Sequence, residues 1–288
     1  MQTRLQLGSN FERECQMEQP IRPCKLCLET KMLEDSHFMP QFIYKYCRTE
    51  GIEPIRVIAD VALSTSRQIH DYLLCKECED ILNKGGESWM AEKLATVDGK
   101  FPLHDLVASG PTLFAGEEYL IYYGIENPEV RSDMIMHFAM GIFWKASVHS
   151  WIAGRTEPWI DLKEHSERIR LFLRGGEFPE EVALNVVLST PEKAYIGAQE
   201  PYQAVGDENR YFMFSVPGIW FNLIVGKNIP HCSQILCLSA NPGRPIVISS
   251  QIAAKSKEAG MMGLERVRKT ESFEKAMKKV KKIKDGLE

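Results

Sequence analysis

The first twenty residues lack the continuous apolar segment that a secretory signal requires. The one candidate for a membrane span, residues 134–153, is interrupted by polar side chains at His137, Lys145, Ser147, His149 and Ser150. Such a segment is typical of a helix buried in a protein core. We therefore expect a cytoplasmic protein with no membrane partner. In that compartment the eight cysteines favour metal binding over disulfides.

The chain also lacks a strong excess of charge, because its formal net charge is only −4. Residues 255–288 nevertheless hold eleven Lys or Arg and six Asp or Glu, which gives +5 there and −9 elsewhere. Phe273, Met277, Val280 and Ile283 recur at helical spacing in this segment and predict a basic amphipathic helix. Three roles stay open for it. The helix docks on the body through its apolar stripe, attracts nucleic acid phosphates, or, least favoured, lies on a membrane surface.

Several motifs of enzymes and nucleotide-binding proteins are absent. The sequence has no GxxxxGK loop to cradle a phosphate, no GxSxG elbow for acyl transfer and no HExxH helix for zinc proteolysis. No internal repeat is visible either. These absences narrow the enzyme classes to metal-assisted phosphodiester cleavage.

Four of the cysteines form two pairs with the spacing of metal ligands, Cys24 with Cys27 and Cys75 with Cys78. Zinc prefers four such thiolates in a tetrahedron, and each CxxC turn presents two of them to one ion. We therefore predict one zinc ion with a closed set of protein ligands, which makes it structural. The alternatives are four ordinary buried cysteines, or a redox pair, for which neither CxxC has the expected strand and helix around it.

The pattern of apolar and turn residues predicts an α+β fold with a mostly antiparallel sheet. We expect an extension over residues 1–19, a zinc-bound module over 20–100, a larger α+β domain over 101–254 and the basic helix over 255–288. Expected helices span residues 128–151 and 161–173, and a short one lies within 41–48. Expected strands span residues 182–188, 211–214, 219–225, 233–238 and 246–249.

The first of these units resembles a known nuclease family. Its motifs are Cys24-x-x-Cys27, then Ser36-His37-Phe38-Met39-Pro40, then Leu73-Leu74-Cys75-x-x-Cys78-Glu79. In this order they resemble the zinc-containing branch of the HNH, or ββα-metal, nucleases, in a variant found in uncharacterised bacterial proteins. The resemblance covers residues 20 to 95 and implies a treble-clef module in which a ββα element holds a divalent cation.

The resemblance also implies roles for individual residues. His37 takes the position of the general base that activates water, and an imidazole with a pKa near 6.5 suits that task. Glu79 takes the position of a catalytic metal ligand, with Asp35 and Asn83 as further candidates for holding Mg²⁺ or Mn²⁺. Asp35 reaches the metal only if its strand is locally bulged. His70 is a candidate for orienting a partner by hydrogen bonding.

Two functions stay open at this point. The first is a metal-dependent endonuclease acting on DNA or RNA, with bacterial defence as the setting that similar proteins suggest. The second is a non-catalytic zinc module that binds nucleic acid or a protein partner, with homo-oligomers as one form. Ser36 stands where the family usually has a metal ligand and favours the second function, while His37 and Glu79 favour the first. In that second case His37 packs under the zinc turn and hydrogen-bonds a backbone carbonyl.

Overall fold

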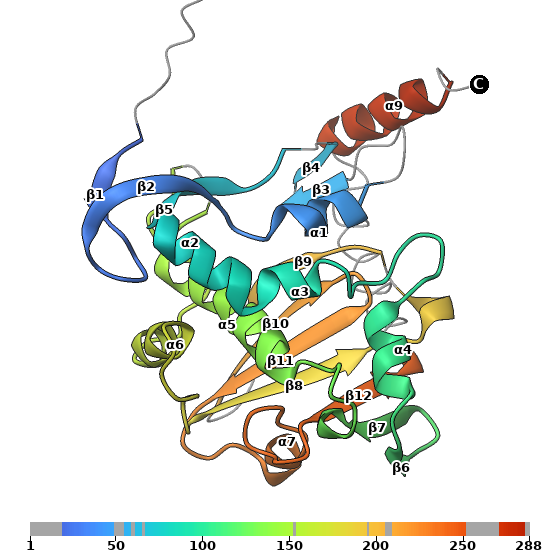
Figure 1. Cartoon of the computed structure of the whole chain (residues 1–288). Helices are drawn as coiled ribbons and strands as arrows, with labels where there is room; N and C mark the ends of the chain where they lie inside the picture. The colour runs from blue at the N-terminus through green and yellow to red at the C-terminus, as the bar shows by residue number, and fades with distance from the viewer. Residues whose placement is uncertain are drawn as a thin grey trace, which may run out of the picture.

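A seven-stranded sheet occupies the centre of the molecule, with a smaller three-stranded sheet near one end (Figure 1). The structure is a computed structural model, and it describes residues 19–48, 55–58, 61–64, 67–151, 154–194, 196–204, 209–251 and 271–285. The α+β class and the mostly antiparallel sheet predicted from the sequence are confirmed. All but one residue of the predicted extension 1–19 lies outside the described residues.

The small sheet is antiparallel and carries the two cysteine pairs. Its strands, in the order β1-β2-β5, are β1 (Ile21–Pro23), β2 (Thr30–His37) and β5 (His70–Cys75). Helix α2 (Lys76–Leu82) follows β5 directly and continues into a π-helix, η1 (Asn83–Glu87), and then α3 (Ser88–Met90). The excursion between β2 and β5 contains α1 (Gln41–Tyr46) and a separate hairpin of β3 (Ile55–Ile58) and β4 (Val61–Ser64).

The large sheet has one parallel pair, β12 with β8, and its other neighbouring strands are antiparallel. Its strands in spatial order are β6 (Thr112–Ala115), β7 (Tyr119–Tyr123), β12 (Pro245–Ser249), β8 (Val182–Leu188), β11 (Ile219–Val225), β10 (Arg210–Val216) and β9 (Gln199–Ala204). Accompanying helices are α4 (Pro102–Ala108), α5 (Ser132–Val148), α6 (His165–Leu173), α7 (His231–Ile235) and the 3-10 turns η2 (Gly124–Glu126) and η3 (Pro191–Lys193).

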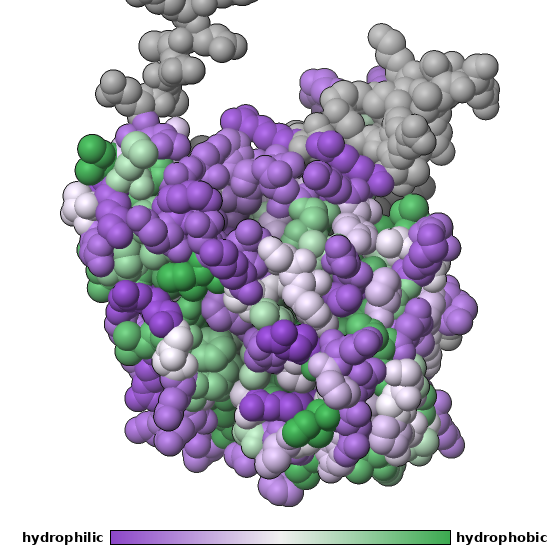
Figure 2. Space-filling model, in the orientation of Figure 1, coloured by the Kyte–Doolittle hydropathy of each residue, from purple (hydrophilic) through white to green (hydrophobic). Residues whose placement is uncertain are grey.

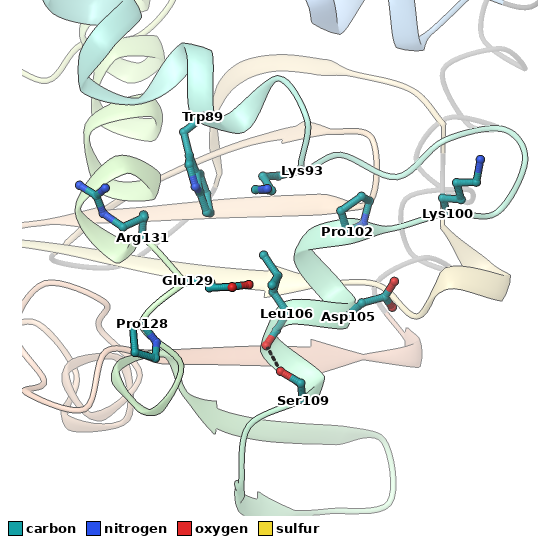
Figure 3. A pocket seen from close by; sticks show the side chains of 10 residues that line it. All are labelled: Trp89, Lys93, Lys100, Pro102, Asp105, Leu106, Ser109, Pro128, Glu129 and Arg131. Carbon is teal, nitrogen blue, oxygen red and sulfur yellow. Dashed lines mark hydrogen bonds between the residues drawn. The ribbon is translucent and has the colours of Figure 1, made fainter.

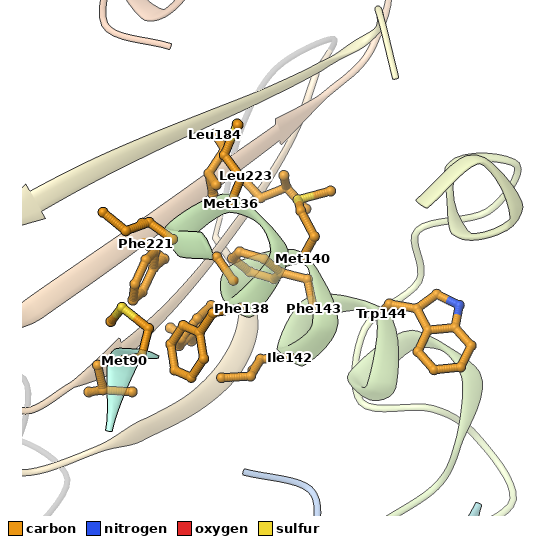
Figure 4. Close-up of a cluster of buried hydrophobic side chains, with 14 of the residues drawn as sticks. Met90, Met136, Phe138, Met140, Ile142, Phe143, Trp144, Leu184, Phe221 and Leu223 are labelled. Atoms are coloured by element: carbon orange, nitrogen blue, oxygen red, sulfur yellow. The ribbon is translucent and has the colours of Figure 1, made fainter. Parts of the chain in front are cut away.

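Helix α5 is buried on most of its circumference because it lies between the large sheet and the segment from α2 to α3. Phe143 meets Phe214 of β10 at 4.8 Å between ring centroids. Phe138 meets Phe221 of β11 at 5.8 Å (Figure 4). On the opposite side α5 packs on η1. The apolar segment at residues 134–153 therefore belongs mainly to a core helix. Among the described residues no helix combines the length and hydropathy that a membrane crossing needs.

One large hydrophobic cluster extends from the small sheet into the large one, and it includes residues on both sides of the predicted boundary at residue 100. Leu26 and Leu74 belong to the same buried cluster as Phe212 and Ile246. The predicted division into modules at residue 100 stays a prediction. What the structure adds is that the two parts share their core.

One predicted strand is wrong. Residues 233–238 were expected to form a strand, but the structure places α7 over His231–Ile235 and a turn after it. Pro230 precedes this helix, and the amide of Gln234 donates to the Pro230 carbonyl at 3.0 Å. The segment had no strand position to take beside β8, because β11 and β12 already occupy both edges of that strand.

The predicted basic helix is present as α9 (Glu271–Asp285), which packs against β4. Residues 255–270 and 286–288 of the predicted segment lie outside the described residues. Ala276 is buried and Phe273 is half-buried, whereas Met277 is 42% exposed. The described part of the apolar stripe is therefore only partly covered by the body.

Candidate metal centre and neighbouring residues

The first cysteine pair lies in a tight turn between β1 and β2. The amide of Leu28 donates to the Cys24 carbonyl at 2.8 Å, and the amide of Cys24 donates to the Glu29 carbonyl at 2.9 Å. Leu28 has a φ of 69°, an uncommon left-handed conformation for a residue other than glycine. The amide of Lys25 donates to the Leu73 carbonyl at 3.2 Å, which fastens this turn to β5.

The second pair lies where β5 passes into α2. Cys75 is the last residue of the strand, and Cys78 is in the first turn of the helix. The register of β2 on β5 places Leu33 opposite Cys75. Strand β2, which begins just after the first cysteine turn, therefore lies beside the second. The amide of Cys75 donates to Cys24 Sγ at 3.4 Å. An N–H group aimed at sulfur favours the thiolate form that a metal ion needs.

The four sulfur atoms lie within 4.8 Å of one another, and Cys27 Sγ and Cys75 Sγ are 3.8 Å apart. A zinc ion with bonds of about 2.3 Å to a tetrahedron of thiolates places its sulfurs about 3.8 Å apart. The cluster therefore fits a metal ion of this kind, as the sequence predicted. Among the residues that the structure describes, no other group of three or more His, Cys, Asp or Glu side chains has metal-ligand spacing.

The cysteine pKa values are shifted in opposite directions within the cluster. A hydrogen bond with the Cys78 thiol lowers the pKa of Cys24 to about 4. Burial raises the pKa of Cys75 to about 12, and the pKa of Cys78 is raised chiefly by its bond to Cys24. Of these three thiols, Cys24 therefore loses its proton first, and an arriving cation must displace the protons of the raised thiols.

A second group of polar residues gathers at the ends of β2 and β5, beside the cysteine cluster. His37 lies opposite His70 in the strand register, with 5.7 Å between the ring centroids. Asp35 Oδ1 lies 2.6 Å from Nδ1 of His70. A register shift between Glu34 and Asp35 marks the local bulge that this position of Asp35 required. The Asp35 and His70 side chains are 49% and 39% exposed, so solvent reaches both.

Burial lowers the pKa of His37 below its usual value of 6.5. Nε2 of His37 lies 3.2 Å from Nε2 of Gln41, so the amide donates to a neutral imidazole when His37 is present as the Nδ1-protonated tautomer. At neutral pH the ring therefore carries an unprotonated nitrogen, which is what a general base requires.

Glu79 and Ser36 face a different environment. Ser36 is 1% exposed, and its hydroxyl accepts the amide of Leu74 at 3.1 Å. Burial raises the pKa of Glu79, an effect opposed by the nearby Lys145 ammonium and by a hydrogen bond with Ser36. Lys145 itself is 2% exposed, and its ammonium donates to the His37 carbonyl at 3.1 Å and to Glu87 at 3.3 Å. These residues connect α2, β2 and α5 in the interior.

The predicted site residues are thus divided between two places. Asp35 and His37 lie at the exposed strand ends with His70, while Glu79 lies in the buried group around Lys145. Asn83 is exposed at the start of η1, where it accepts a hydrogen bond from Ser88 at 2.7 Å. This bond joins Asn83 to α3 and not to His37 or Asp35.

The role of Lys145 was not predicted, although the sequence carried a signal for it. A lysine in an otherwise apolar helix must find a partner when that helix is buried, because an isolated buried charge is costly. The position of the partner, Glu87, depends on the π-helix η1, which sequence patterns do not reveal.

The surface around this site is mostly hydrophilic in the view that faces β2 and α2 (Figure 2). An open groove of about 700 Å³ lies elsewhere, between α3, α4 and the turn at 128–131 (Figure 3). The indole of Trp89 projects into it, with the Lys93 ammonium 5.3 Å from the ring centroid. Cations and carboxylates both line this groove, and none of the predicted site residues does.

Comparison of the chain with family models, with curated proteins and with solved structures finds no match.

Proposed function

We propose that the four cysteines hold one structural zinc ion. The support is the spacing of their sulfurs, which agrees with a tetrahedral site, and the burial of Cys24, Cys75 and Cys78 to 2% exposure or less. Four protein ligands complete the coordination, so the ion stabilises the β1–β2 turn against α2 without taking part in chemistry.

We further propose that the unit built around this zinc cleaves phosphodiester bonds in nucleic acid, as an HNH-type nuclease. The observation that supports this most is the convergence of Asp35, His37 and His70 at the solvent-exposed ends of β2 and β5. A carboxylate and an imidazole side by side are a ligand pair that Mn²⁺ accepts, and Mg²⁺ accepts the carboxylate.

Each residue has a distinct role in this proposal. Asp35 and His70 would hold a second divalent ion, which would neutralise charge on the phosphate. His37 accepts the proton of the attacking water, which its lowered pKa allows at neutral pH. Glu79 is not assigned as a metal ligand with Asp35 and His70, because it faces Lys145 and Ser36 instead. The proposed substrate is DNA or RNA.

The test is a set of single variants assayed for Mn²⁺-dependent degradation of DNA and RNA. His37→Ala removes the general base and is expected to slow cleavage by about a hundredfold to ten-thousandfold. Asp35→Ala and His70→Ala are expected to abolish cleavage and also Mn²⁺ binding measured by calorimetry. Zinc content and thermal stability should stay close to wild type in all three variants.

A matched control comes from a second His–Asp pair, His104 with Asp105, whose side chains are 3.1 Å apart in α4 and are 18% and 71% exposed. His104→Ala should leave cleavage unchanged. The nuclease proposal would be contradicted if His37→Ala cleaved at the wild-type rate. It would also be contradicted if the wild-type protein neither cleaved nucleic acid nor bound Mn²⁺ through Asp35.

The second candidate is a non-catalytic zinc module that binds nucleic acid or a protein partner. Ser36 favours it, because this residue occupies the usual place of a metal ligand yet is buried and bonded to the backbone of Leu74. On this proposal the four cysteines are indispensable for function, whereas His37 and His70 are not.

A further inference from the structure

Arg170 is a buried cation that reaches from α6 to the first cysteine turn. Its Nη1 donates to the carbonyl of Leu26 at 2.6 Å, and Leu26 lies between Cys24 and Cys27. The Arg170 side chain is only 9% exposed. Its other nitrogens, Nε and Nη2, each donate to a carboxylate oxygen of Glu167 at 2.7 Å. The guanidinium therefore stands between this carboxylate and the turn that carries two metal ligands.

The negative charge of a metal-bound cysteine cluster would be stabilised by a cation at this contact. Four thiolates around one Zn²⁺ carry a net charge of −2, and a buried charge of that size is costly unless cations or N–H groups oppose it. The pKa of Arg170 is raised first by its hydrogen bonds to Glu167, and Cys27 and Cys78 raise it further. The guanidinium therefore lies close enough to interact electrostatically with these sulfurs.

Lys31, a second cation near the cluster, has a side chain that is 36% exposed and is already paired. Lys31 approaches Cys75, but its ammonium pairs with Glu29 at 3.0 Å and Glu77 at 3.7 Å on the surface. Water screens such surface pairs. Glu167 is itself 59% exposed, so solvent weakens its field more than that of the buried guanidinium beside the turn.

We propose that Arg170 balances the charge of the zinc centre, so that α6, an element packed on α5, sets the zinc affinity of the amino-terminal unit. This rests on the zinc binding proposed above and is independent of nuclease activity. Arg170 acts as a positioning residue, since it contacts the turn and not the metal.

The experiment uses the full-length zinc-loaded chain and measures zinc affinity by competition with a chromogenic chelator. Arg170→Gln replaces the charged guanidinium with a shorter, neutral amide, and should weaken zinc binding by about 10- to 100-fold. Arg170→Lys keeps the charge and should stay within about threefold of wild type. Arg168→Gln is the matched control on the same helix, because Arg168 pairs with Glu181 on the surface, and its zinc affinity should not change.

Glu167→Gln distinguishes an effect of the Arg170 charge from an effect of how Glu167 holds the guanidinium in place. Removing this carboxylate leaves the positive charge unopposed, so zinc affinity should be unchanged or higher. Equal losses in Arg170→Gln and Arg170→Lys, or a loss in Glu167→Gln as large as in Arg170→Gln, would overturn the proposal in favour of a scaffold role. Wild-type protein that binds no zinc would instead contradict the zinc site itself.

Discussion

At the scale of single residues, Gly86 shows how closely two helices approach. A Cβ atom at this position would lie 2.4 Å from the Met134 carbonyl oxygen and 2.8 Å from the Phe138 amide nitrogen of α5. These are backbone atoms, so they cannot move aside as a flexible side chain would. The absence of a side chain is therefore what lets η1 pack on α5.

Gly86→Ala is accordingly expected to lower the free energy of unfolding by about 1–3 kcal/mol, the usual cost of overpacking. Gly110→Ala is the control, because its Cβ would meet only the Val107 carbonyl, at 3.4 Å, and φ there is not positive. Its effect should stay within about 0.5 kcal/mol. Urea denaturation of both variants measures the difference, and equal values would refute close packing at η1.

The residues of the cysteine cluster could be predicted from the sequence, because CxxC spacing fixes which sulfurs can share an ion. The surroundings of His37 and Glu79 could not. Whether a strand side chain faces solvent or the interior depends on register, and a register shift lies between Glu34 and Asp35. The same shift decides that Asp35 meets His70.

At the scale of elements, α5 connects the two sheets through Lys145 as well as through its apolar side chains. Lys145→Met removes the bond to the His37 carbonyl and leaves Glu87, 17% exposed, without its cation. Breaking a buried pair costs about 3–5 kcal/mol, and the partial exposure of Glu87 places this variant near the lower end.

The measurement is a double-mutant cycle with Glu87→Gln, followed by thermal and urea unfolding. The double variant should be more stable than the sum of the two single losses implies, because it leaves no unpaired carboxylate. Lys76→Met is a surface control, since Lys76 pairs with Asp80 in water, and it should change stability little. Additive losses would show that Lys145 and Glu87 are not coupled.

Elements were predicted from the sequence with uneven success. Strands β8 and β11 were predicted at their observed ends, because continuous β-branched and aromatic residues bounded by turn residues define a buried strand. Helix α7 was taken for a strand, since a short apolar segment does not disclose whether a strand edge is free beside it. Helix α4 was missed because Pro102 and Gly110 at its ends indicate a loop as readily as a helix.

At the scale of the whole molecule, burial makes stability depend on pH. It lowers the pKa values of His37, His137 and His165 below 6.5. The unfolded chain therefore binds more protons than the folded chain once the pH falls below about 6.5. Stability is full above that pH and declines as pH is lowered, by at most about 1.4 kcal/mol per pH unit for each histidine.

Urea denaturation between pH 7.5 and 5.5 measures this decline, and zinc content at each pH separates it from loss of metal. In His165→Gln the decline should be shallower, because His165 is 2% exposed and its variant has no proton to take up. His231→Gln, in α7, alters a histidine with an exposed side chain and serves as the comparison. A slope in His165→Gln equal to that of wild type would exclude His165 as a source of acid sensitivity.

The order of strands in the large sheet constrains how the chain is made. β12 lies between β7 and β8, so the hairpin of β6 and β7 joins the rest of the sheet only through residues 245–249. On a ribosome, β7 and β8 are therefore exposed as unpaired edges while more than fifty further residues are added after β8, and such edges invite pairing between chains. The risk of such pairing during synthesis ends only when β12 emerges. A chain interrupted before β12 would expose the edges of two separate parts of the sheet.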